Sequence, residues 1–139
     1  MHEFILFLHF FGLMLGAAGG FASGFIMMRA NSAPADRAQT LRSLGWPLAM
    51  MSGTGLLILW ITGIIMLIMA GGPSVMPTVF WLKIVFVVIA TVLIGLVHRT
   101  YAEMRRTGDV ALGQRLKTIG PVIGLSVLLA VFFAAYAFN

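Results

Sequence analysis

The sequence predicts an all-α membrane protein, folded as a single antiparallel bundle of four transmembrane helices over residues 1–139. Composition is the first reason, because 60% of the residues are hydrophobic and only 9% are charged. A soluble domain carries about 25% charged residues, so this chain has too little polar surface to cover a globule in water. The second reason is that four apolar stretches reach the roughly 20 residues that a membrane-spanning helix needs. Short connections between them favour antiparallel neighbours.

The four expected spans are residues 3–28, 46–70, 78–98 and 119–138. No basic residue precedes the first span, so we expect a retained helix and not a cleaved signal peptide. Gly71-Gly72-Pro73 is expected to end the second helix. Pro47 and Pro121 are expected in the first turn of their helices, where the missing N–H costs nothing.

Basic residues are distributed unevenly between the connections. Eight of the nine lie between residues 29 and 42 or between 99 and 117, whereas residues 71–77 carry no charge. The positive-inside rule makes the basic side cytoplasmic and leaves both termini outside. We therefore expect an integral protein of a bacterial inner membrane. The same rule accounts for the basic residues without any nucleic-acid partner.

Small residues form a row along the first helix. Glycine recurs every fourth residue, at Gly12, Gly16, Gly20 and Gly24, and His9 stands at the head of this row. Such a row lets another helix approach the backbone closely. It could equally receive a flat ligand such as a haem, held by His9 with its ring along Gly12 and Gly16. The sequence leaves both interpretations open.

Two ionisable side chains are expected well inside the membrane, His9 and Lys83, and such residues are functional candidates because they are costly there. Each lies roughly 7–9 Å below the outer boundary at 1.5 Å per residue. His98 lies about 22 Å deeper, so it cannot bind the opposite face of a haem held by His9. Met66 and Tyr136 fall in the same outer layer as His9 and complete the candidate cofactor site.

These side chains could bind a cofactor or could have a purely structural role. A neutral imidazole is a good haem-iron ligand, which makes His9 the candidate metal ligand. Lys83 could pair with a haem propionate or a carboxylated substrate. Alternatively, His9 could hydrogen-bond to a neighbouring helix, and Lys83 could extend outward along its stem to the interface. His98 stands next to Arg99 and is expected to be an interfacial anchor.

Some classes of protein are excluded by what the sequence lacks. The chain has no cysteine, so it contains no disulfide, iron–sulfur cluster or cysteine nucleophile. No paired carboxylates lie within the predicted spans, which argues against a proton-driven antiporter or a divalent-cation channel.

A set of short motifs covers nearly the whole chain: His9, Arg42 with Pro47-Leu48-Ala49-Met50, Trp81-Leu82-Lys83, His98, Arg115 and Pro121. In these residues the chain resembles the HemJ family of membrane protoporphyrinogen oxidases and the related four-helix modules near copper-resistance protein D. The resemblance implies haem b bound by His9, with Lys83 beside the haem or the substrate in a catalytic role. Family enzymes carry a Pro-Arg-Leu-rich segment with a second histidine where this chain has Gly24-Phe25-Ile26-Met27-Met28-Arg29.

Three functions follow as hypotheses. The first is a haem-b-binding membrane protein with a redox role, acting on a tetrapyrrole or a quinone or transferring electrons. The second is a non-catalytic accessory subunit that packs through its glycine row into a homo-oligomer or a larger membrane complex. The third is an outer-side copper-handling protein that uses the side chains of His2, His9, Met66 and Met69.

Overall fold

The computed structural model describes residues 1–137, and these fold into four long helices with two short 3-10 turns. The elements are α1 (His2–Ala30), α2 (Ala35–Met69), η1 (Pro73–Val75), α3 (Thr78–Thr107), η2 (Val110–Leu112) and α4 (Gly113–Ala137). All four long helices are apolar enough to cross a membrane, and no strand occurs within residues 1–137. This confirms the predicted all-α four-helix bundle. Phe138, the last residue of the predicted fourth span, lies outside the described residues.

The helices are longer than the apolar spans predicted from the sequence. α2 begins at Ala35 and not at residue 46, α3 continues to Thr107, and α4 begins at Gly113. Hydropathy detects the part of a helix that lies in hydrocarbon, whereas hydrogen bonding continues wherever the sequence still favours a helix. Helix formers such as Ala, Arg and Gln fill these polar extensions. Most of the basic residues assigned to loops therefore lie on helices.

The two prolines lie inside helices, so the prediction that they occupy first turns is wrong. Pro47 and Pro121 stand in the interiors of α2 and α4. Each leaves one backbone carbonyl without its helical donor. In membrane helices such prolines are tolerated because neighbouring groups satisfy the freed backbone. The N-terminal extensions of α2 and α4 place both prolines more than one turn from the helix start.

Glycines end α2 and α3. Gly71 and Gly72 have φ values of 103° and 89°, and the Gly72 N–H bonds to the Leu67 carbonyl at 3.0 Å. Residues with side chains rarely adopt these φ values, which confirms that the Gly-Gly-Pro segment ends α2. Gly108 ends α3 in the same way, with φ 71° and its N–H 2.9 Å from the Met104 carbonyl.

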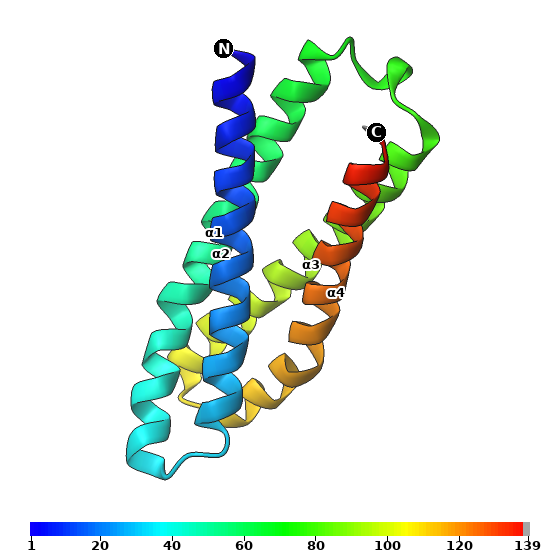
Figure 1. Cartoon of the computed structure of the whole chain (residues 1–139). Coiled ribbons are helices and arrows are strands. Elements are labelled where there is room, and N and C mark those ends of the chain that lie inside the picture. Colours follow the sequence, from blue (N-terminus) through cyan, green and yellow to red (C-terminus); the bar gives the residue numbers. More distant parts are fainter. Residues whose placement is uncertain (138–139) are drawn as a thin grey trace.

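The helices are arranged as two antiparallel hairpins. α1 packs along α2 and α3 packs along α4, while contacts between the hairpins are fewer. Figure 1 shows the hairpins close together at the end that carries residues 31–34 and 108–112, and farther apart toward the end that carries residues 70–77. We call the first the basic end and the second the opposite end. α1 begins and α4 finishes at the opposite end (Figure 1).

The first half of the glycine row of α1 packs directly against α2, together with the neighbouring Gly19. A Cβ atom added to Gly12 would lie 3.0 Å from the Gly55 carbonyl oxygen, and one added to Gly19 would lie 2.6 Å from the Ser52 nitrogen. A Cβ on Gly55 would in turn lie 2.6 Å from the Gly16 Cα. These glycines hold two helix backbones together, as expected for small residues at a membrane helix interface. No backbone atom of α2 lies within 4 Å of a Cβ added to Gly20 or Gly24.

Hydrogen bonds also connect α2 to α3. The Trp60 indole N–H donates to the Thr91 hydroxyl at 3.0 Å. Farther toward the basic end, His98 Nε2 lies 2.6 Å from the Ala49 carbonyl oxygen. At the basic end itself, each of the four helices contributes one residue to a small core, which consists of Met27, Ala49, Tyr101 and Leu116. The two hairpins are thus joined by hydrogen bonds between α2 and α3 and by this shared core at the basic end.

Candidate functional site

His9 lies half-buried between α1 and α2, with one ring nitrogen fixed by a hydrogen bond. Its Nδ1 is 2.8 Å from the Thr62 hydroxyl oxygen. The Thr62 hydroxyl donates to the Ile58 carbonyl at 2.6 Å, so its single proton is already used. The oxygen therefore accepts from Nδ1–H, which places the proton of a neutral His9 on Nδ1.

The second nitrogen of His9 is the chemically available one. Nε2 carries a lone pair in this tautomer, and within residues 1–137 no hydrogen bond to it occurs. Gly63 leaves room beside the ring, because a Cβ at that position would lie 3.6 Å from His9 Cε1. A histidine whose Nδ1–H is held by a hydrogen-bond acceptor is the usual form of a metal-ligating imidazole.

Lys83 comes from the other hairpin. It is half-buried near the beginning of α3, and its Nζ lies 5.5 Å from the centre of the Phe80 ring. His9 lies in the first third of α1 and Lys83 in the first third of α3, and both helices begin at the opposite end (Figure 1). The structure therefore brings the two predicted ionisable residues to the same end of the bundle.

The remaining predicted site residues occupy different environments. Gly12 is buried against Ile58 and Gly55 of α2, and Gly16 also faces α2, so a helix and not a ligand lies along this part of the row. Met66 is half-buried on α2. Tyr136 is 71% exposed and stacks beside Phe132 on α4.

His98 turns into the bundle, so its predicted role as an interfacial anchor is wrong. Its Nε2 donates to the Ala49 carbonyl at 2.6 Å, and its ring fills the space above Gly53, where any Cβ would overlap it. Gly53 is what admits the ring, because a larger residue would block this approach. The Nδ1 atom of His98 is then a lone-pair acceptor, and no hydrogen bond to it occurs among the described residues.

Tyr101 lies one turn beyond His98 and is also buried, with 3% of its surface exposed. Its hydroxyl is 3.0 Å from the Ser23 hydroxyl of α1, and the Tyr101 ring lies over Gly45 of α2. This contact was not predicted from the sequence. Ser23 follows Gly16 at a spacing of seven on the same helix face, and that spacing was the one available signal.

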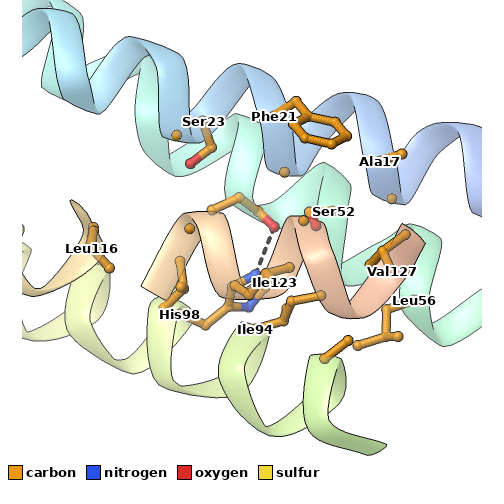
Figure 2. Close-up of a pocket in the computed structure, with 18 of the residues that line it drawn as sticks. Ala17, Phe21, Ser23, Ser52, Leu56, Ile94, His98, Leu116, Ile123 and Val127 are labelled. Atoms are coloured by element: carbon orange, nitrogen blue, oxygen red, sulfur yellow. Dashed lines mark hydrogen bonds between the residues drawn. The ribbon is translucent and has the colours of Figure 1, made fainter. Parts of the chain in front are cut away.

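A cavity of about 100 Å³ lies between the four helices, on the basic-end side of the bundle's middle. Its polar lining comes from Ser23, Ser52, His98 and Tyr101. Figure 2 shows the His98 ring reaching across this space toward α2, with Ser52 also on the cavity wall. Glycines on α1 and α4 form part of its boundary, namely Gly16, Gly20, Gly24, Gly120 and Gly124.

Clusters of metal ligands do not occur in residues 1–137: no group of three or more His, Cys, Asp or Glu side chains is placed to hold a metal ion. A haem needs only an axial ligand from the protein, because its iron is already held by the macrocycle. The described residues therefore offer separate imidazole nitrogens, at His9 and at His98, and no group of three or more ligands.

No protein-family model matches the chain, and no curated protein or solved structure matches it.

Proposed function

We propose that the chain is a haem-b-binding integral membrane protein with His9 as an axial ligand of the iron. One observation carries the proposal: Nδ1 of His9 is tied to Thr62 while Nε2 has no hydrogen-bond partner among the described residues. The Thr62 hydroxyl fixes the tautomer and the orientation of the ring. The unprotonated nitrogen then has its lone pair available to iron.

Lys83 supplies a cation for a haem propionate, which is the second group that the proposed site needs. Haem b carries two propionates, and a cation in the low-dielectric part of a membrane stabilises such a group by a charge-assisted hydrogen bond. The lysine reaches this region from α3, whereas the histidine belongs to α1. A haem held by both would connect the two hairpins at the end where they contact each other least.

The chemistry supplied by bound haem is one-electron transfer between ferric and ferrous iron. The chain's part in that role is to hold the ligand nitrogen deprotonated and to keep bulk water away with its apolar helices. This favours an oxidoreductase or electron-transfer function on a tetrapyrrole or a quinone, as in the HemJ-like proteins that the sequence resembles. The basic end faces the cytoplasm in this proposal, because positive-inside bias places the basic helix ends there.

An absorption spectrum of the protein purified in mild detergent tests the proposal. Protein expressed with ample haem should show a Soret band, and sharp α and β bands after dithionite reduction. His9→Ala should abolish the Soret band while far-UV circular dichroism stays helical. His2→Ala is the matched control, since His2 is exposed in the first turn of α1, and it should leave the spectrum unchanged.

Two subtler variants test the supporting residues. Thr62→Val keeps the shape of the side chain but removes the acceptor for His9 Nδ1–H, and loss of such a partner typically weakens metal binding by about 10- to 100-fold. Lys83→Met keeps most of the stem and removes the charge, and should weaken haem binding less. Haem retained at full occupancy in His9→Ala, or a featureless spectrum from the wild type, would refute the proposal.

A further inference from the structure

The cavity between the four helices contains polar groups that the fold leaves without partners. Ser52 is only 4% exposed and lines the cavity. No hydrogen bond to its hydroxyl occurs among residues 1–137, and this oxygen is not one of the fully enclosed unpaired atoms, which are Asn31 Nδ2 and Arg42 Nε. Ser126 of α4 is buried to a similar degree, but its hydroxyl donates to the Val122 carbonyl of its own helix at 2.8 Å.

His98 contributes the second unpaired atom. Its Nε2–H is committed to the Ala49 carbonyl, so Nδ1 can only accept a hydrogen bond. Figure 2 shows His98 and Ser52 lining the same cavity. A ligand that satisfies both side chains must donate a proton to an imidazole nitrogen and present an oxygen to a hydroxyl. A phenolic O–H group meets both requirements.

The size of the cavity restricts the body of the ligand. An apolar cavity of about 150 Å³ accommodates benzene, and this one measures about 100 Å³. It suits one six-membered ring with slight adjustment of the walls, and it is too small for a tetrapyrrole. Ligand pockets for larger molecules measure about 300–1,000 Å³.

The cavity wall between α1 and α4 offers a route from the lipid. Gly24 of α1 and Gly120 of α4 both line the cavity, and a Cβ added at either position would meet nothing within 4 Å. No side chain from these two positions closes the gap. A ligand that enters here arrives from the hydrocarbon and can leave a long apolar tail there.

From these observations we infer that the cavity is a binding site for the ring of a lipid-soluble hydroquinone. One hydroxyl of the ring donates to His98 Nδ1 and accepts from the Ser52 hydroxyl, and the isoprenoid or alkyl tail extends between α1 and α4. The site is separate from His9 and does not depend on haem binding there.

Equilibrium binding of a decyl-substituted 1,4-benzohydroquinone to the protein in nanodiscs, kept reduced under anaerobic conditions, tests the inference. We expect saturable binding that is about tenfold tighter than that of the corresponding benzoquinone, which has no O–H donor for His98. Ser52→Ala should weaken hydroquinone binding about five- to tenfold, the effect of losing one hydrogen bond. Ser126→Ala is the matched control, because Ser126 is equally buried at 5% exposure but bonds within its own helix.

Gly24→Leu provides a variant that fills the entrance without disturbing the packing, since the space beside Gly24 is open. It should abolish hydroquinone binding while the helical circular dichroism spectrum is retained. Unchanged binding in both Ser52→Ala and Gly24→Leu would overturn the inference, as would absence of saturable binding to the wild type. Decylbenzene binding as tightly as the hydroquinone would also overturn it, because the cavity would then accept any apolar tail.

Discussion

Replacing Gly55 by alanine should force α1 and α2 apart and destabilise the bundle. A Cβ at this position would lie 2.6 Å from both the Gly16 Cα and the Gly12 carbonyl oxygen. The Gly16 nitrogen would lie closer still, and ordinary van der Waals contact begins at 3.4 Å, so the helices must separate by at least about 0.8 Å. The obstructing atoms belong to the backbone of α1 and cannot rotate away.

The size of the effect follows from that separation. A gap of about 0.5–1 Å forfeits a quarter to a half of the dispersion energy of each contact, and overpacking of this kind typically costs about 1–3 kcal/mol. The same movement would lengthen the bond of 2.8 Å between His9 and Thr62 to about 3.6 Å, beyond hydrogen-bonding distance. Interhelical hydrogen bonds in membranes contribute about 0.6 kcal/mol on average. Together these terms predict a loss of about 2 kcal/mol.

Unfolding by sodium dodecyl sulfate in mixed micelles, followed by far-UV circular dichroism, measures this loss. Gly95→Ala is the control, because Gly95 lies within α3 and a Cβ there would meet nothing within 4 Å. That control should be neutral, or more stable by a fraction of the roughly 1 kcal/mol by which alanine exceeds glycine in helix propensity. A free energy of unfolding for Gly55→Ala equal to that of Gly95→Ala would refute the close packing of α1 on α2.

Two other predictions concern the hydrogen bond between Tyr101 and Ser23 and the orientation of the chain in the membrane. Tyr101→Phe removes the hydroxyl that bonds to Ser23 at 3.0 Å, and the same unfolding assay should show a loss of about 1 kcal/mol; unchanged stability would show that this hydrogen bond contributes nothing. Because the natural chain has no cysteine, Ser32→Cys and Ser74→Cys report which end faces outward. A membrane-impermeant maleimide should label the cysteine at position 74, and not that at 32, in intact cells, and the reverse pattern would contradict the proposed orientation.

The sequence alone determined that the chain is a bundle of membrane-spanning helices, because lipid requires each span to satisfy its own backbone hydrogen bonds. An apolar stretch of sufficient length then leaves no alternative to a helix. The Gly71–Gly72 ending of α2 was equally predictable, since its positive φ values favour residues without a side chain. The limits of the helices could not be predicted in this way, because the polar ends of α2 and α4 lack the apolar signal that marks a span.

Tertiary structure decided what the small residues and the histidines do. A glycine row can admit a helix or a ligand with equal ease, and only the position of α2 decides that a helix covers Gly12 and Gly16, whereas Gly20 and Gly24 line the cavity. The direction of the His98 ring depended on Gly53, which is 45 residues away along the chain. Hydropathy and residue spacing describe one helix at a time. Whether His9 Nε2 and the Ser52 hydroxyl have hydrogen-bond partners depends instead on which groups a second helix places beside them.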